Sequence, residues 1–274
     1  MPDSTSAPII TFLSDYGLAD DFVGICHGVI AKSCPSARVI DLTHGIPRHD
    51  VRAGAIVLSE ALAYLPVGVH LAVVDPDVGA RRRAIALRLA DGRLLVGPDN
   101  GLLSLAAAAG GGVEEAVDIA HSGYRLQPVS ATFHGRDIFA PVAAALAAGA
   151  APADVGEPLD PDSIVLLELP QPTRDGDVVV AHVRYIDRFG NIQLDAGHEH
   201  VTDSGLKLGR PATIELVDGT SQQVHFVRTF ADAGRDELLL YEDAQRRLAI
   251  AVRHGDAAAL LGLTIDAELR VQPG

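Results

Sequence analysis

Cysteine is scarce in this sequence, which has two cysteines, one methionine and no tryptophan among its 274 residues. If Cys26 and Cys34 lie on one helix, the helical rise places them about 12 Å apart. That separation is too large for a disulfide bond, so no disulfide framework is expected. We therefore expect a reduced, cytoplasmic protein in which both thiols are small core residues.

A secretory signal and a membrane span are not expected from this sequence. The first eight residues, MPDSTSAP, contain no basic stretch followed by an apolar one. The alanine-rich segment 139–151 is broken by glycine and is too short to cross a bilayer. These absences favour a protein that does not associate with membranes.

Basic residues are fewer than acidic residues in this sequence. Lysine and arginine together number 22 against 36 aspartate and glutamate residues, which gives a formal net charge of -14. A nucleic-acid partner is not expected, because contact with phosphates requires a basic surface. The acidity favours solubility, and the hydrophobic content of 48% favours a packed globular protein over a disordered one.

Several well-known catalytic motifs are absent as well. No GxGxxG follows the first apolar run, which argues against a dinucleotide-binding fold of the usual kind. No GxxxxGK[ST] or GxSxG occurs, so nucleotide hydrolysis by a phosphate-binding loop and serine hydrolase chemistry are unsupported. The cysteines and histidines do not have the spacing of a zinc site.

The first 150 residues alternate between short apolar runs and helical patterns. Strands are predicted at residues 8–13, 39–43, 70–75, 84–89 and 93–96. Helices are predicted at residues 19–32, 50–64 and 139–148, the second with Asp50 as its N-cap. This alternation is typical of a mainly parallel sheet with helices on both faces.

The pattern changes after residue 150. Residues 151–175 contain several prolines, glycines and aspartates and are predicted to be a linker. Short strands are then predicted at residues 178–186, 212–217, 223–230, 237–241 and 248–252, with a helical turn near 256–261. The expected fold is an N-terminal α/β domain, residues 1–165, followed by a smaller C-terminal β domain, residues 166–274.

Carboxylates follow or end three of the predicted strands, at Asp15, Asp41 and Asp75. In an open parallel sheet, ligands bind beyond the carboxyl ends of the strands. A single aspartate in such a place is often only a turn or cap residue. Three in equivalent places favour a functional site along one rim of the sheet.

Two loops add polar residues to this rim. Residues 97–101, GPDNG, fit a tight turn and N-cap at least as well as a ligand contact. Residues 132–137 place His134 beside Arg136 and Asp137 just before a helix. A capped helix start would explain the aspartate, but the histidine favours a general base.

The residues alone leave two classes of enzyme open, a metal-dependent hydrolase and a metal-free nucleoside enzyme. On composition, a hard metal ion could be held by a set of oxygen and nitrogen ligands from this rim, Asp41, His44, His49, Asp50, Asp75, Asp99, His134 and Asp137.

The segments just described resemble the S-adenosyl-L-methionine hydroxide adenosyltransferase family, which is related to the fluorinase and chlorinase enzymes. The resemblance covers nearly the whole chain and is strongest in the first domain. It is carried by LSDYG at 13–17, DDFVG at 20–24, DLTH at 41–44, VVDPDVGARRR at 73–83, GPDNG at 97–101, TFHGRDIFAPVA at 132–143 and IDRFGN at 186–191.

This resemblance implies an enzyme that displaces methionine from the ribose carbon of S-adenosyl-L-methionine with water and yields adenosine. It implies a homotrimer with sites at subunit interfaces, no cofactor besides the substrate and no metal ligands. The catalytic residues implied are Asp75, Arg82 and His134. The substrate-binding residues implied are Asp15 for the ribose hydroxyls and, from the C-terminal motif, Asp187, Phe189 and Asn191.

The halogenases carry an aromatic residue where this chain has Asp75, which favours water over a halide as the nucleophile. The chain departs from the family at two places. Asp77 stands where a glycine is usual, and Asp243-Ala244-Gln245-Arg246 replaces an Asn-Ser-x-Gly-like stretch that helps to hold the methionine carboxylate. Two rivals remain, a metal-dependent hydrolase of a nucleoside-type substrate and a non-catalytic adenosine or S-adenosyl-L-methionine sensor.

Overall fold

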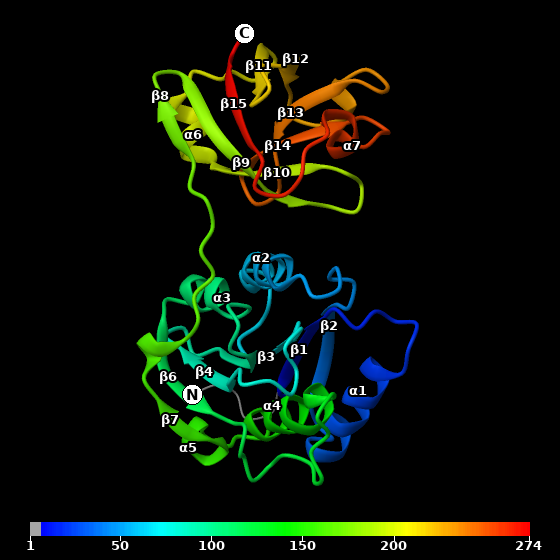
Figure 1. Cartoon of the computed structure of the whole chain (residues 1–274), viewed down its shortest axis with the longest axis vertical. Coiled ribbons are helices and arrows are strands. Elements are labelled where there is room, and N and C mark those ends of the chain that lie inside the picture. The colour runs from blue at the N-terminus through cyan, green and yellow to red at the C-terminus, as the bar shows by residue number, and fades with distance from the viewer. Residues whose placement is uncertain (1–6) are drawn as a thin grey trace. The chain divides into compact units, whose positions relative to one another are not determined.

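The computed structural model describes residues 7–274 of the chain, which form two compact units (Figure 1). The boundary between the units falls between Leu167 and Glu168. Each unit has its own sheet and its own hydrophobic core. The architecture confirms the predicted fold class, an N-terminal α/β part with a mostly parallel sheet and a C-terminal β part.

The N-terminal unit is built on a seven-stranded sheet. Its strands, in spatial order, are β2 (Arg38–Thr43), β1 (Ile9–Ser14), β3 (Val69–Val73), β5 (Leu94–Pro98), β4 (Ala84–Leu89), β6 (Val113–Asp118) and β7 (Glu157–Leu159). Strands β2, β1, β3 and β5 run parallel, whereas β4 pairs antiparallel with both β5 and β6. The carboxyl ends of β1 and β3 therefore meet at one edge of the sheet.

Two pairs of helices cover this sheet. Helix α1 (Phe22–Ser33) packs against α4 (Ala140–Ala147), and α2 (Val51–Leu62) packs against α3 (Ser104–Ala109). Figure 1 shows the two pairs on opposite faces of the sheet, as the alternation of strands and helices predicted. The carboxylate of Asp50 accepts a hydrogen bond of 2.8 Å from the backbone N–H of Ala53, which confirms the predicted N-cap of α2. Helix α1 begins three residues later than predicted.

Both cysteines are free and buried, as expected for small core residues. Cys26 lies on the inner face of α1 and Cys34 is the residue directly after its last turn. The prediction that they do not form a disulfide bond is confirmed.

The prediction of a linker over residues 151–175 is wrong for its first part. Residues Pro152–Val155 form helix α5, and β7 adds an antiparallel edge strand next to β6. Val155 is 1% exposed and belongs to the hydrophobic core. Pro152 begins α5 and Gly156 ends it, and the same residue types are common in linkers.

Hydrogen bonds hold the chain that follows β7 against the GPDNG loop and the start of α3. Asp99 accepts from Arg83 Nε at 2.7 Å and from the backbone N–H of Val165 at 2.8 Å, while Ser104 Oγ accepts from the N–H of Leu167 at 3.1 Å. Asn100 donates to the carbonyl of Val74 at 2.9 Å. These contacts support the structural interpretation of this loop over a ligand-binding one.

The C-terminal unit is a small β-barrel. Its strands are β8 (Thr173–Asp175), β9 (Val178–Ile186), β10 (Ile192–Gly197), β11 (Pro211–Leu216), β12 (Ser221–Phe226), β13 (Leu238–Glu242), β14 (Arg247–Val252) and β15 (Glu268–Pro273). The spatial order is β10-β14-β13-β12-β11-β15-β9-β8, and pairing of β9 with β10 closes the sheet. Closure pairs the strand edges that an open sheet of this length would expose, except at the short terminal strand β8.

Two short helices complete the barrel, α6 (His198–Asp203) and α7 (Ala257–Leu261). Asp256 caps α7 by accepting from the N–H of Ala259 at 2.8 Å, which confirms the helical turn predicted there. Strands β10 and β15 were not predicted, because IQLDAG and ELRVQP contain polar residues that interrupt the apolar pattern.

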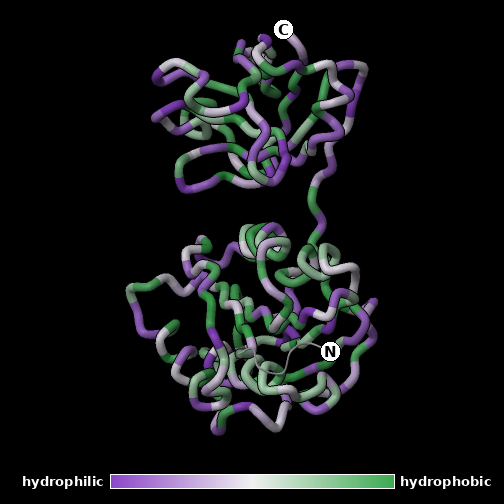
Figure 2. Tube along the Cα trace, turned by 180° about the vertical axis from the view of Figure 1, so that it is seen from behind, coloured by the Kyte–Doolittle hydropathy of each residue, from purple (hydrophilic) through white to green (hydrophobic). Residues whose placement is uncertain are grey.

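Hydrophobic residues follow the strands of each unit and hydrophilic residues gather in the connecting loops, as Figure 2 shows. Among residues 7–274, none of the helices has the length and apolar character needed to span a bilayer.

A buried histidine in the N-terminal sheet makes stability depend on pH. His70 on β3 is fully buried; its Nδ1 lies 2.9 Å from Thr11 Oγ1, and its Nε2 has no hydrogen-bond partner. Burial lowers the pKa of His70 from 6.5 to about 4, and the charge of Arg93 adds to the effect. The unfolded chain therefore takes up a proton near pH 6.5 that the folded chain takes up only near pH 4.

We expect the unfolding free energy of this unit to fall as the pH is lowered through this interval, by about 3 kcal/mol over the whole range. Urea unfolding at pH 7.5 and pH 5.0 measures the change. The difference between the two conditions should shrink in His70→Gln, which has no group to titrate at this position. An equal pH dependence in wild type and variant would contradict the assignment to His70.

Candidate active site

The turn after β1 places Asp15 at the carboxyl edge of the sheet. Gly17 turns the chain with a φ of +68°, and its N–H donates to the carbonyl of His44 at 2.8 Å. The N–H of His49 donates to Asp15 Oδ2 at 2.9 Å, which fixes the orientation of the carboxylate. His49 has a φ of +67°, which is uncommon for a residue with a side chain.

Asp75 and Arg82 form a buried ion pair at the carboxyl end of β3. Arg82 Nε lies 2.9 Å from Oδ1 and 3.1 Å from Oδ2 of Asp75, and Arg82 Nη2 also donates to Oδ2. The Asp75 side chain is 6% exposed and the Arg82 side chain is 8% exposed. The loop between them turns back at Gly79, which has a φ of +81°. Gly79 also packs closely against Ala131, and an added Cβ would lie 2.4 Å from the carbonyl oxygen of Ala131.

His134 completes this cluster. Arg82 Nη2 donates to His134 Nδ1 at 2.8 Å, although the two residues are 52 positions apart. A guanidinium group only donates hydrogen bonds, so Nδ1 is the acceptor and the neutral ring carries its proton on Nε2. Burial lowers the pKa of His134 and the charge of Arg82 lowers it further, which favours the neutral ring at neutral pH.

The helix that follows His134 starts with a π-helical turn, Gly135–Phe139, which leads into α4. A side chain at Gly135 would displace the Tyr16 ring, because an added Cβ would lie 2.1 Å from the hydroxyl oxygen of Tyr16. Asp137 is 1% exposed and accepts from the N–H of Ser130 at 2.8 Å and from Arg136 Nε at 2.6 Å. These bonds shape the loop before His134, so Asp137 has a structural role.

A cavity of about 600 Å³ opens above these residues, a size in the range of small-molecule sites. It is lined by residues from the loops after β1, β2 and β3 and from the loop before α4, Asp15, Tyr16, Gly17, Asp20, Phe22, His44, Gly45, Ile46, Arg48, His49, Asp75, Val78, Thr132, His134 and Gly135. Asp15, Asp75 and His134 thus lie on one cavity, and Arg82 lies directly behind Asp75 and His134.

The prediction that Asp41 joins this rim is wrong. Asp41 lies within β2 rather than beyond its end, pairs in register with Phe12, and is absent from the cavity wall. Its carboxylate lies behind the cavity wall, 2.8 Å from the imidazole of His27 on α1 and 3.1 Å from that of His44. Side chains alternate between the faces of a strand, so a shift of one position turns the carboxylate away from the rim.

Three aromatic residues at or next to the cavity were not predicted as functional; Tyr16 and Phe22 line it and Phe133 packs against them. The rings of Tyr16, Phe22 and Phe133 form a cluster with centroid separations of 5.7 Å, 6.0 Å and 5.2 Å. Phe22 is 40% exposed although it starts a helix whose inner face is apolar. The sequence did contain a signal that could have identified these rings. Each one lies inside or next to a polar motif rather than on the apolar face of an amphipathic helix.

The predicted residues of the C-terminal unit form the turn between β9 and β10. Asp187 Oδ1 accepts from the N–H of Phe189 at 2.8 Å and of Asn191 at 3.0 Å, and Oδ2 accepts from Asn191 Nδ2 at 2.8 Å. The Asp187 carboxylate therefore builds the turn. Phe189 is 67% exposed, and the guanidinium of Arg188 lies 5.5 Å from its ring centre.

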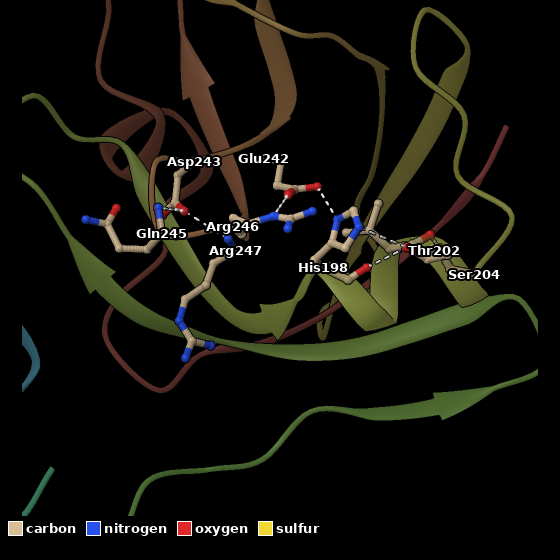
Figure 3. Close-up of polar contacts among 9 residues, drawn as sticks. His198, Thr202, Ser204, Glu242, Asp243, Gln245, Arg246 and Arg247 are labelled. Atoms are coloured by element: carbon tan, nitrogen blue, oxygen red, sulfur yellow. Dashed lines mark hydrogen bonds and ion pairs between the residues drawn. The ribbon is translucent and has the colours of Figure 1, made fainter. Parts of the chain in front are cut away.

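The segment that replaces the family's Asn-Ser-x-Gly-like stretch is the turn between β13 and β14 (Figure 3). Asp243 Oδ1 accepts from the backbone N–H of Gln245 and Arg247, each at 2.9 Å. Arg246 occupies the position of the family's glycine with a φ of +60°, which explains why glycine is usual there. Its Nε donates to Glu242 at 3.2 Å.

Figure 3 shows Arg247 directed away from this pair. Its guanidinium donates to the carbonyl of Asp195 at 2.7 Å. Arg246, with a side chain 66% exposed, has its charge balanced by Glu242. Neither arginine has a free guanidinium group that is aimed at a carboxylate ligand.

The other departure from the family, Asp77, does not strain its loop. Positive φ angles in this loop are confined to Gly79, and Asp77 accepts from the N–H of Ala80 at 2.9 Å through its carbonyl. Asp77 is exposed and does not line the cavity. A side chain is therefore accommodated where the family usually has glycine.

Known proteins match this chain over most of its length. Residues 10–156 match the SAM hydroxide adenosyltransferase N-terminal domain, and residues 181–270 match the SAM hydroxide adenosyltransferase C-terminal domain. The chain is 50% identical over 267 residues to an (R)-S-adenosyl-L-methionine hydrolase of Salinispora tropica, covering 97% of this chain and 98% of that protein.

A crystal structure of an uncharacterized conserved protein from Thermotoga maritima superposes with a TM-score of 0.89 at 33% identity, covering 96% of this chain and 99% of that one. A fluorinase of an Actinoplanes species is 29% identical over 271 residues, covering 89% of this chain and 90% of the fluorinase. The two matched domains together span most of the sequence. The chain belongs to the SAM hydroxide adenosyltransferase family.

Proposed function

We propose that this chain hydrolyses S-adenosyl-L-methionine to adenosine and L-methionine. The observation that carries the proposal is the buried Asp75–Arg82–His134 cluster at the wall of the cavity that Asp15 also lines. The identity of 50% to a protein named (R)-S-adenosyl-L-methionine hydrolase supports the same substrate.

In this reaction the main task of the protein is to position the water and the substrate. The sulfur of the substrate carries a positive charge, so the bond from sulfur to the ribose 5′ carbon is already weakened. Water attacks this carbon from the side opposite the sulfur, a carbon–oxygen bond forms, and methionine leaves with the electron pair of the broken bond. Holding a nucleophile in line can contribute about 7–11 kcal/mol.

In this proposal Asp75 orients the water. Its Oδ1 accepts one hydrogen bond, from Arg82 Nε, and has a second lone pair free to accept from a water in the cavity. The attacking water becomes strongly acidic as the new bond forms, so the Asp75 carboxylate can accept its proton. The proton then passes from Asp75 to solvent. His134 Nδ1 is occupied by Arg82, which makes the ring a partner that positions Arg82.

Asp15 is proposed to accept from both hydroxyl groups of the ribose. The bond from the N–H of His49 leaves Oδ1 and one lone pair of Oδ2 available in the cavity. Asp187, Phe189 and Asn191 are proposed to bind the nucleoside and the methionine end, and the exposed Phe189 ring supplies an apolar contact surface.

We propose a homotrimer with active sites at its subunit interfaces, working in the cytoplasm. The assembly is what the resemblance of the motifs to this family implies, and two free buried cysteines fit a reducing compartment. Light scattering at micromolar concentration is expected to give three times the mass of the 28.7 kDa chain. A stable monomer that is still active would contradict an interfacial site.

The proposed reaction is tested by incubating the protein with S-adenosyl-L-methionine in heavy-oxygen water with a high concentration of chloride. Mass spectrometry is expected to find adenosine with heavy oxygen at its 5′ position, equimolar methionine and no chlorinated nucleoside. The charge of Asp75 repels a halide and holds a water, which is the reason for this selectivity.

The same reaction with a chelator present separates the rivals. Retained turnover fits the proposed metal-free hydrolysis, whereas a loss that one divalent ion restores would support a metal-dependent hydrolase. Binding of the substrate without any product would support a sensor, and a halogenated product would overturn the choice of nucleophile.

A further inference from the structure

Two histidines and the aspartate that is absent from the cavity wall converge beside β2. His27 lies on α1, Asp41 on β2 and His44 directly after β2, and Figure 1 shows α1 and β2 on the same side of the N-terminal unit. One ligand atom of each, the ring nitrogens and a carboxylate oxygen, all lie within 4.8 Å of one another. The proposed hydrolysis uses none of the three.

The ring of His44 is held in place from two sides. Its Nδ1 lies 2.7 Å from Ser14 Oγ, and its ring packs edge-on against Phe12 with the centroids 4.7 Å apart. The His44 side chain is 2% exposed. A metal-binding histidine is commonly oriented through its second nitrogen in this way.

The other ring nitrogen of His44 is left without a hydrogen bond. Nε2 is buried and lies 3.1 Å from Asp41 Oδ1, a contact that is an ion pair only when the ring is protonated. If Nδ1 donates to Ser14 Oγ, the lone pair of Nε2 faces a carboxylate that also only accepts. The buried Nε2 is then left without a donor, which is costly, whereas a cation between Nε2 and the half-exposed carboxylate would contact both atoms.

His27 supplies a third ligand to the same point. Its Nε2 lies 2.8 Å from Asp41 Oδ1, the same oxygen that Nε2 of His44 faces. Ligand atoms around tetrahedral zinc, at bond lengths of about 2.0–2.1 Å, are separated by about 3.3 Å. Small outward movements of the His27 and Asp41 side chains, which are 36% and 42% exposed, reach that spacing.

We propose that His27, Asp41 and His44 bind one divalent transition-metal ion, with zinc as the best match, outside the catalytic cluster. Two imidazoles and one carboxylate suit zinc and its first-row neighbours, and they disfavour magnesium, which prefers oxygen ligands. The partial exposure of His27 and Asp41 leaves a route for entry and room for a water ligand. Because His44 also lines the cavity, the ion would stiffen the loop that carries His49.

The test is calorimetric titration of Zn²⁺ into chelator-treated protein that carries no polyhistidine tag. One ion per chain is expected to bind, and an excess of Mg²⁺ should not displace it. His27→Gln should weaken binding by at least about 100-fold, and Ser14→Ala, which releases the ring of His44, by about 10–100-fold. His225→Gln is the matched control, since His225 is an exposed histidine of the C-terminal unit and should leave binding unchanged.

Folding of each variant is checked by thermal melting, and Zn²⁺ should raise the melting temperature of wild type and of the control but not of His27→Gln. Equal binding by wild type and His27→Gln, or competition by Mg²⁺, would overturn the proposal. Turnover of chelator-treated protein reports separately on the proposed hydrolysis, so the two ideas fail independently.

Discussion

Replacing Arg82 with glutamine is expected to destabilise the N-terminal unit by about 3–5 kcal/mol and to abolish turnover. The variant leaves the carboxylate of Asp75, whose side chain is 6% exposed, without its positively charged partner. An unpaired buried charge is far more costly than the loss of a surface ion pair. For a unit of this size the melting temperature should fall by about 6–20 °C.

The neighbouring Arg81→Gln is the matched control. Arg81 is exposed, so the change should leave both the melting temperature and turnover close to wild type. The double variant Asp75→Asn with Arg82→Gln removes both charges and should recover part of the stability, but no activity. A double variant as unstable as the sum of the single changes would mean that the two charges do not stabilise each other.

The second large effect is expected from Asp75→Asn, which keeps the shape of the side chain and removes its charge. Turnover should fall by about 100-fold or more, the lower end of what a positioned base contributes. The Michaelis constant should change little, because the contact with the attacking water strengthens only in the transition state. Steady-state kinetics with S-adenosyl-L-methionine separates the two parameters.

Asp77→Asn provides the comparison, since it makes the same chemical change on an exposed carboxylate two positions further along. It should leave turnover within about two-fold of wild type, as surface substitutions usually do. His134→Ala should also lower turnover, because it removes the ring that positions Arg82, and its loss should not add to that of Asp75→Asn if both changes act on one water. Equal effects of the Asp75 and Asp77 changes would remove Asp75 from the reaction.

Much of the candidate site could be predicted from local pattern alone. The apolar runs before Asp15 and Asp75 predicted parallel strands, and the carboxyl ends of such strands meet at one edge. His134 was marked by a dense polar motif at a helix start. These inferences hold because strand periodicity and turn chemistry are properties of short segments.

Local pattern failed where a side chain's neighbours come from distant parts of the chain. The sequence of β2 did not reveal whether Asp41 faces the cavity or His27, because one position of register reverses the face of a strand. The proline-rich segment after residue 150 becomes α5 and β7 only because an edge of the sheet is free to receive it.

The sequence by itself determined the two-part architecture, the absence of a disulfide bond and the residue types available at the rim. Only the tertiary structure decided which of those residues act together. It joins Arg82 to both Asp75 and His134, occupies the ring nitrogen that a base would need, and gives Arg246 the left-handed backbone of a glycine. The physical reason is that pairing, burial and protonation depend on three-dimensional neighbours, which segment periodicity does not specify.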